Sequence, residues 1–324
     1  MSFLKYQTAL ILFFVSCGTL PNKISQRKDY RTEMRNFVIN ISEHAKSKNP
    51  SFAIIPQNGI ELITDDGTPD GRLSSKYLNA IDGHGQEELF YGYNRDNKPT
   101  PHPTTKYLKN LLQVSQGAGN KILVIDYTNA EKKINDSQKR NSKLGFTPFV
   151  ATERSLTNIP DVEIPNKNAN NISLLKDVKN FLFFINPDKY EYKEDYLEDI
   201  AATDYDMVII DLFFHGDVQF TAQEIEKLKT KKNGAKRMVC CYMSIGEAED
   251  YRYYWQKSWK RYAPSWLDME NKNWKGNYKV KYWDKSWQKL VLGNPNSYLD
   301  KILSSGFDGV YLDIIDAYEH FENQ

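Results

Sequence analysis

Carboxylate side chains stand at or just after the ends of nearly every apolar run in this chain. They are Glu61, Asp82, Asp126, Asp188, Asp211, Glu247, Asp284, Asp313 and Asp316. Loops and helix N-termini favour Asp and Glu for structural reasons, and we expect that explanation for Asp188 and Asp284. It explains Asp126 and Asp313 poorly, because both lie within or at the end of apolar runs, where an unpaired carboxylate is costly. Clustered carboxylates raise one another's pKa, and two of them flanking a sugar linkage perform glycoside hydrolysis.

Aromatic side chains gather near the same chemistry. All six tryptophans lie between Trp255 and Trp287, with several tyrosines among them. Aromatic faces stack on sugar rings and attract amino groups, so this segment is a candidate for substrate binding. A long loop packed into its own small core needs the same residues, and both interpretations stay open.

Other reaction types find less support. His84 could carry a proton, but a single histidine near a strand end is more often a hydrogen-bonding neighbour. No HExxH or paired-histidine spacing is present, and neither GxGxxG nor GxxxxGK[ST] occurs, so we expect no metal and no cofactor. Cys240 and Cys241 are adjacent in a predicted strand and point to opposite faces, which favours buried packing over a nucleophilic thiol.

Charge and cysteine content exclude further classes of protein. Among 324 residues, 43 Lys and Arg balance 42 Asp and Glu, giving a net charge of +1. Such a balance provides no basic field, so we expect no nucleic-acid partner. Three cysteines are too few for a disulfide scaffold.

The N-terminus reads as an export signal. Lys5 precedes the apolar stretch Thr8–Val15, which is too short to span a bilayer and suits the core of a signal peptide. Val15-Ser16-Cys17 resembles a lipoprotein box, in which Cys17 would be lipidated. A plain secretion signal and an uncleaved anchor are the alternatives. We therefore expect a signal at 1–17, a tether at 18–27, and an exported protein, either a cell-envelope lipoprotein that meets the membrane only through its anchor or a secreted one.

Eight short apolar runs alternate with helical patterns and predict strands. They are Phe52–Gln57, Tyr77–Asp82, Lys121–Thr128, Phe181–Pro187, Met207–Leu212, Arg237–Ser244, Tyr278–Trp283 and Gly309–Ile314. Helices are predicted over Tyr30–Lys48 and, from a capping box, over Thr221–Lys231. This alternation favours a (β/α)₈ TIM barrel over an open sheet, and barrels carry their active sites at the carboxyl ends of their strands. Residues 158–173, rich in Asn and Pro, read as a linker.

Four segments carry a family resemblance. Ser244–Trp255, Pro264–Leu267, Trp274–Trp287 and Gly306–Phe321 resemble glycoside hydrolase family 114, whose characterised members are endo-α-1,4-polygalactosaminidases. The resemblance is strongest to the bacterial branch of that family. In that family the strand similar to Phe181–Pro187 comes first, and the segment similar to Lys28–Glu61 follows the fifth strand. The resemblance therefore implies a circularly permuted barrel over residues 28–324, with strands six to eight preceding strands one to five. A fused gene built from two partial copies is the alternative.

The resemblance also implies which residues act. Asp313 and Glu61 match the two catalytic carboxylates, Asp313 as nucleophile or base and Glu61 as acid/base. The further residues expected to bind substrate are Glu247, Asp316, Asp211, Asp82, Asp126, Tyr127, Tyr242, Tyr311, Asn58 and Trp283. The expected function is that of a monomeric, exported, endo-acting hydrolase of a galactosamine-type polysaccharide, whose cationic chain suits an acidic, aromatic site. The alternative is a non-catalytic, glycan-binding surface lipoprotein of the same fold.

Overall fold

The computed structural model describes residues 28–324. The predicted signal at 1–17, its Cys17 and the tether at 18–27 lie outside these residues. Within the described part, no helix combines the length and apolar character that crossing a membrane requires.

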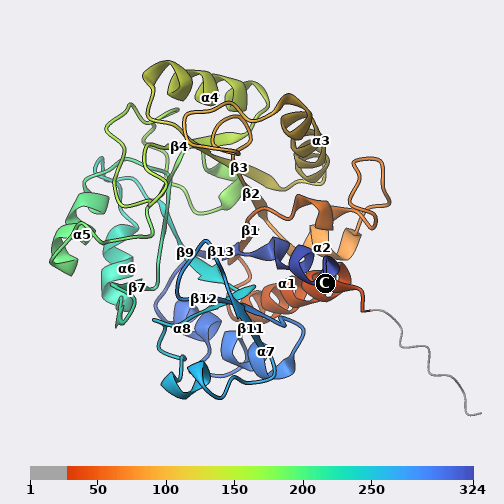
Figure 1. The fold of residues 1–324 in the computed structure, drawn as a ribbon. Coiled ribbons are helices and arrows are strands. Elements are labelled where there is room, and N and C mark those ends of the chain that lie inside the picture. Colours follow the sequence, from red (N-terminus) through yellow and green to blue (C-terminus); the bar gives the residue numbers. More distant parts are fainter. Residues whose placement is uncertain (1–27) are drawn as a thin grey trace, which may run out of the picture.

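Parallel strands form the centre of the molecule (Figure 1). One sheet has the order β1-β13-β9-β6-β5 and a second the order β2-β3-β4, and every strand pair in both is parallel. The strands are β1 (Ala53–Pro56), β2 (Gly83–Glu87), β3 (Lys121–Tyr127), β4 (Thr147–Ala151), β5 (Phe181–Phe183), β6 (Met207–Ile210), β9 (Met238–Ser244) and β13 (Gly309–Asp313). The predicted α/β class is confirmed.

The two parallel sheets meet at both of their edges. A parallel bridge joins Gln57, just after β1, to Gly85 of β2, and the amide of Asn58 donates to the carbonyl of Gly85 at 2.8 Å. At the other edges β4 lies against β5, where the rings of Phe149 and Phe181 are 5.6 Å apart.

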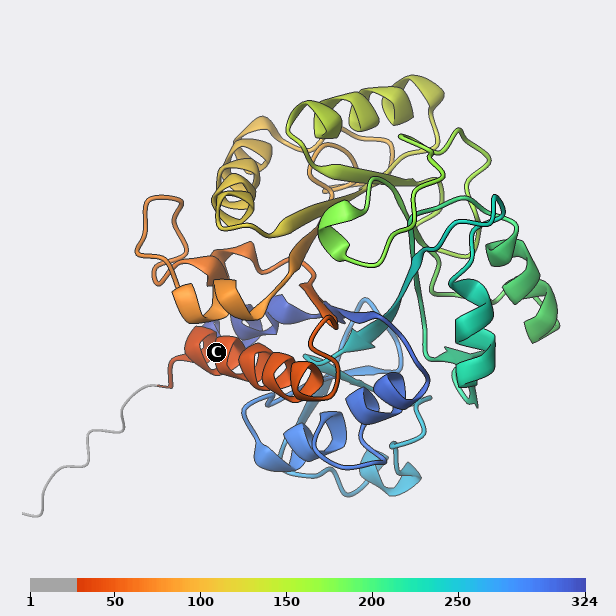
Figure 2. The same cartoon turned by 180° about the vertical axis from the view of Figure 1, so that it is seen from behind.

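Helices cover the outside of these sheets, as both views of the ribbon show (Figures 1 and 2). They are α1 (Tyr30–Lys48), α2 (Ser75–Ala80), α3 (His102–Gly117), α4 (Glu131–Lys143), α5 (Lys193–Ala201), α6 (Ala222–Leu228), α7 (Lys285–Val291), α8 (Tyr298–Ser304) and α9 (Tyr318–Glu322). The predicted helix Tyr30–Lys48 is confirmed, with Asp29 as its N-cap accepting from the Thr32 amide. The capping box predicted at Thr221 and Glu224 is also present and starts α6.

One strand prediction was wrong, and two of the parallel strands, β2 and β4, were not predicted. The run Tyr77–Asp82 lies largely in α2, and the strand beside it is β2, whose sequence Gly-His-Gly-Gln-Glu has no apolar pattern. A Cβ atom at Gly85 would collide with the side chain of Tyr311, so glycine is needed here because β2 passes close to β13. Strand β4 was missed because it is short and contains a proline.

The run Tyr278–Trp283 does not belong to a parallel sheet. It overlaps β12 (Asn277–Val280), which pairs antiparallel with β10 (Glu247–Glu249) and β11 (Leu267–Glu270) in a small separate sheet. A further short hairpin pairs β7 (Phe213–Phe214) with β8 (Val218–Gln219). Parallel strands therefore number four before the segment 158–173 (β1 to β4) and four after it (β5, β6, β9 and β13), which differs from the predicted three and five. The segment itself forms neither helix nor strand.

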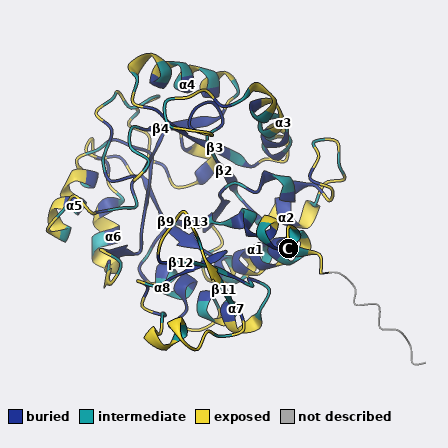
Figure 3. Cartoon of the chain, in the orientation of Figure 1, coloured by how far each residue is buried: buried dark blue, intermediate teal, exposed yellow. Residues whose placement is uncertain are grey.

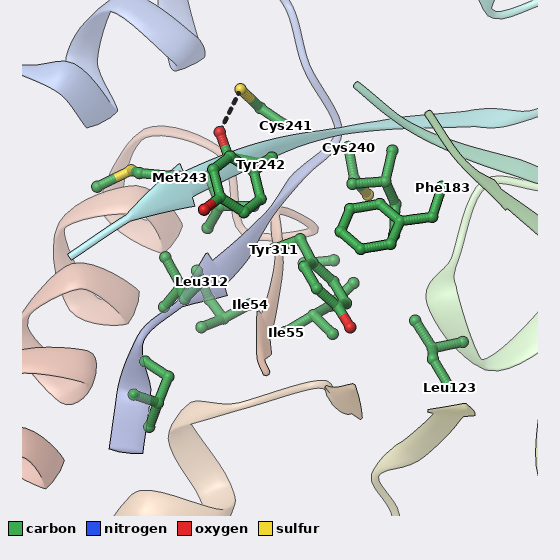
Figure 4. Packing of buried hydrophobic residues seen from close by; sticks show 14 of the residues in the cluster. Ile54, Ile55, Leu123, Phe183, Cys240, Cys241, Tyr242, Met243, Tyr311 and Leu312 are labelled. Atoms are coloured by element: carbon green, nitrogen blue, oxygen red, sulfur yellow. Dashed lines mark hydrogen bonds between the residues drawn. The ribbon is translucent and has the colours of Figure 1, made fainter. Parts of the chain in front are cut away.

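Burial follows this layering, with the strands covered and the outer helix faces exposed (Figure 3). Between the sheets lie Ile54, Leu123, Phe183 and Tyr311, all essentially inaccessible to solvent (Figure 4). The rings of Phe183 and Tyr311 are 5.1 Å apart. This apolar interior forms a rigid base beneath the carboxyl ends of the strands.

Candidate active site

A cavity of about 560 Å³ opens at the carboxyl ends of the parallel strands. Its lining includes the last residues of two strands, Glu87 of β2 and Asp313 of β13, and Asp211, which directly follows β6. Carboxyl ends of parallel strands are where α/β proteins place ligands, because the loops there are free to vary. The cavity is therefore the candidate active site.

Asp313 is held by two hydrogen bonds. The hydroxyl of Tyr242 donates to its Oδ2 at 2.6 Å, and the amide of Ile314 donates to its Oδ1 at 2.7 Å. Ile314 has a φ of 55°, a strained conformation for a β-branched residue, and this turn points its amide back at the carboxylate. Burial, with the charge of Glu87 as the next contribution, raises the pKa of Asp313 to about 8.

Glu87 reaches the same cavity from the other parallel sheet. Its Oε2 accepts from the side-chain amide of Asn58 at 3.1 Å, while its own amide donates to Asn58 Oδ1 at 3.0 Å. The hydroxyl of Tyr127 donates to its Oε1. Asp316 lines the cavity as well, and burial, together with the charges of Glu319 and Glu87, raises the pKa of Asp316 to about 7. The charge of Glu87 thus acts on both Asp313 and Asp316 within this cavity.

Glu61 does not line this cavity. It lies in the 3₁₀ turn Ile60–Ile63, where its Oε2 accepts a 3.4 Å hydrogen bond from the hydroxyl of Tyr318. Asn58 and Gly59 both have positive φ, and this left-handed turn leaves Asn58 facing the cavity while the next turn directs Glu61 toward α9. The predicted meeting of Glu61 with Asp313 in one cleft is therefore not what the structure has, and Glu87 stands in that place.

Most of the residues expected to bind substrate do line the cavity, namely Asn58, Tyr127, Asp211, Tyr242, Glu247 and Asp316. Asp211 forms a two-pronged ion pair with Arg252, with both N–O distances 2.7 Å, and Arg252 also binds Glu249. Glu247 is fully buried and accepts from Asn271, Asn277 and Lys279.

Four of the expected residues have structural roles elsewhere. Asp82 precedes β2, accepts from the Ile54 amide and pairs with Lys46. Asp126 is buried and accepts from Ser137 and from the amides of Phe90 and Tyr91. Tyr311 belongs to the core, and Trp283 packs on Tyr30 and Phe321. Alternation within β3 explains one of these errors, because Tyr127 faces the cavity and its neighbour Asp126 must then face outward.

The sequence reasoning also missed residues of the site. Glu87 lies in a strand without apolar pattern, so its position at a strand end was not visible. Arg154 lines the cavity, stacks over Tyr127 at 4.0 Å and pairs with Glu88 and Asp96. His84 is fully buried, and burial lowers the pKa of His84 to about 4 against an opposing hydrogen-bond contribution from the Asn58 backbone. Within residues 28–324 no cluster of three or more His, Cys, Asp or Glu side chains could hold a metal ion.

Comparisons with known proteins find similar sequences for part of this chain. The chain is 39% identical over 157 residues to an uncharacterized protein of Methanocaldococcus jannaschii, covering 48% of this chain and 42% of that one. Uncharacterized proteins of Deinococcus radiodurans (38% over 133 residues; 41% and 40% covered) and Thermotoga maritima (36% over 128 residues; 39% and 37% covered) are also similar. The chain thus spans less than half the length of these relatives. Residues 184–324 match the sequence model of glycoside hydrolase family GH114, and this match assigns that part of the chain to the family.

Proposed function

We propose that this protein is an endo-acting glycoside hydrolase whose two reacting carboxylates are Asp313 and Glu87. The observation that carries the proposal is that both line one cavity, in which burial and then the charge of Glu87 raise the pKa of Asp313. The family match supports hydrolysis of a glycosidic bond, and its range contains Asp313 but not Glu87.

Asp313 is the carboxyl that holds a proton at neutral pH. Asp313 keeps that proton up to about pH 8, because burial and the neighbouring negative charge oppose its ionisation. The hydrogen bonds from Tyr242 and Ile314 stabilise its carboxylate once the proton has left. A protonated carboxyl beside an ionised one supplies an acid for the leaving oxygen and a carboxylate for the anomeric carbon or for the attacking water.

The charges of the cavity favour a cationic sugar polymer. Arg252 neutralises Asp211 and Glu249, whereas Glu87 and Asp188, which also line the cavity, form no ion pair within the described residues. A partly deacetylated galactosamine-type polysaccharide carries ammonium groups that would complement this excess of negative charge. Cationic polymers should therefore be cleaved faster than fully N-acetylated or acidic ones.

The same site supports a permuted (β/α)₈ barrel. Asp313 and Glu87 come from different sheets, which touch at β1 with β2 and at β4 with β5. Helices α9 and α1, which would be consecutive in the family's order, are joined by an ion pair between Arg31 and Glu322 at 2.9 Å. We propose that the eight parallel strands close into one barrel in the order β5, β6, β9, β13, β1, β2, β3, β4, with residues 28–324 as one monomeric domain.

We further propose export of the protein, with Cys17 lipidated or the signal removed for secretion, so that the polysaccharide partner is met outside the cytoplasm. The motif Val15-Ser16-Cys17 supports lipidation. Incorporation of radiolabelled palmitate that is lost in Cys17→Ser tests the anchor. Release of new reducing ends from a galactosamine polymer tests the activity, and binding of that polymer without cleavage would favour the non-catalytic alternative.

A further inference from the structure

The turn between β11 and β12 carries a tryptophan that the core does not use. Trp274 is 56% exposed and yet lines the cavity. The other tryptophans are buried or pack against the hydrophobic core. A large indole left facing both solvent and a cavity is unusual, because tryptophan is among the side chains that gain most from burial.

The turn that carries Trp274 is well ordered by hydrogen bonds. The amide of Asn277 donates to the Trp274 carbonyl at 3.1 Å, and the Trp274 amide donates to the Asn271 carbonyl at 3.3 Å. The amide of Gly276, whose φ is 90°, donates to Glu270 at 2.8 Å. The indole is therefore presented from a fixed backbone rather than from a loose loop.

Glu247 holds this hairpin in place from below. Its side chain is completely buried, and it accepts from Asn271 Nδ2 at 2.8 Å, from Asn277 Nδ2 at 3.3 Å and from Lys279 Nζ at 3.3 Å. All three donors belong to the hairpin on either side of Trp274. A buried carboxylate whose partners lie on a single hairpin fixes the position of that hairpin.

We propose that Trp274 is a stacking platform for a sugar unit of the polymer outside the catalytic pair, and that Glu247 is the residue that positions it. This inference rests on the proposed function, since it extends the same cavity along a polysaccharide chain. The flat apolar face of a pyranose stacks on an indole. Long oligomers that reach Trp274 would therefore gain a binding contact that short oligomers lack. Tyr251, which is 49% exposed and also lines the cavity, extends the aromatic rim.

The test compares Trp274→Ala with Tyr262→Ala. Tyr262 is 69% exposed, follows the neighbouring 3₁₀ turn Lys257–Lys260 and does not line the cavity, so it is a matched control. Binding of galactosamine oligomers of increasing length is measured by calorimetry on the Asp313→Asn protein, and hydrolysis on the active protein. Trp274→Ala should raise Kd and KM for long oligomers about tenfold with a smaller change in kcat, an effect that shrinks for the disaccharide. Tyr262→Ala should match the parent, and Trp274→Phe should recover part of the loss.

Glu247→Gln tests the positioning role. It should raise KM for long oligomers in the same direction, and it should add little in a Trp274→Ala background, because the two residues act through one hairpin. Additive effects of the two changes would overturn that role, and equal binding of long oligomers by the Trp274→Ala and parent proteins would overturn the platform. If the polymer is cleaved normally but its binding does not depend on Trp274, the platform proposal is wrong and the hydrolase proposal is retained. Trp274-dependent binding without cleavage removes the hydrolase proposal instead, and no binding to any oligomer removes both.

Discussion

Asp313 ends β13, near the end of the chain, and Glu87 ends β2, in its first third, yet both carboxylates line the same cavity. Each is held by a tyrosine hydroxyl, Tyr242 for Asp313 and Tyr127 for Glu87. Burial, and after it the charge of Glu87, raises the pKa of Asp313 to about 8.

The stability of the protein should depend on pH through Asp313. Its pKa rises from an ordinary 3.8 to about 8 in the folded protein, so the folded state binds a proton that the unfolded chain has released. The resulting stabilisation is complete below about pH 4 and is lost as pH rises through about 8. Asp313→Asn should therefore match the parent near pH 4, gain on it by up to about 1.4 kcal/mol per pH unit between about pH 4 and pH 8, and gain no more above that. Urea unfolding at several pH values measures this, and a constant difference would contradict it.

The alkaline limit of activity should move in opposite directions in two variants. The hydrogen bond from Tyr242 lowers the pKa of Asp313, whereas the charge of Asp316 raises it. Activity should fall as the proton leaves Asp313, so Tyr242→Phe should shift this fall to higher pH and Asp316→Asn to lower pH. Profiles of kcat/KM against pH give the comparison. Shifts of the same sign in both variants would be inconsistent with Asp313 as the proton holder.

Arg252 should be important for folding. Its side chain is 2% exposed and pairs with Asp211 and Glu249 at the wall of the cavity. Arg252→Met leaves two carboxylates without their cation and should cost about 3–5 kcal/mol of unfolding free energy. Arg72, whose side chain is 87% exposed in its pair with Asp65, is the control, and Arg72→Met should cost less than about 1 kcal/mol. Similar losses of unfolding free energy in both variants would show that the buried ion pairs of Arg252 contribute no more to stability than the exposed pair of Arg72.

Gly85 should be intolerant of a side chain because Tyr311 fills the space beside it. Gly85→Ala should destabilise the protein by about 1–3 kcal/mol, as overpacking does. Adding Tyr311→Leu should recover part of that loss if the collision is its cause. Thermal unfolding of the single and double variants measures the recovery, and strictly additive losses would mean that β2 and β13 do not approach as described.

Sequence alone predicted the elements whose local signals are strong. Helix α1 follows from apolar residues such as Met34, Phe37 and Ile41 at helical spacing, and α6 from its capping box. Strand β2 was not predicted, because its Gly85 is required by a tertiary contact with Tyr311. Such a contact produces no periodic pattern in the sequence. Because β2 was not predicted, the position of Glu87 at the end of a strand was not predicted either.

The errors at the site have a similar origin. Asp313 was recognised because it ends an apolar run within the family motif. Glu61 follows the apolar run of β1 just as closely, but the left-handed turn at Asn58 and Gly59 sends it away from the cavity. The direction that the chain takes after a strand depends on one or two backbone angles, and residue type and spacing do not determine these angles.

The most direct test of the catalytic pair compares three conservative variants on one galactosamine polymer. Glu87→Gln and Asp313→Asn should each lower kcat by at least a hundredfold while the proteins still unfold cooperatively. Glu61→Gln, outside the cavity, should keep kcat within a few-fold of the parent. Full activity in Glu87→Gln together with loss of activity in Glu61→Gln would contradict the pairing of Asp313 with Glu87.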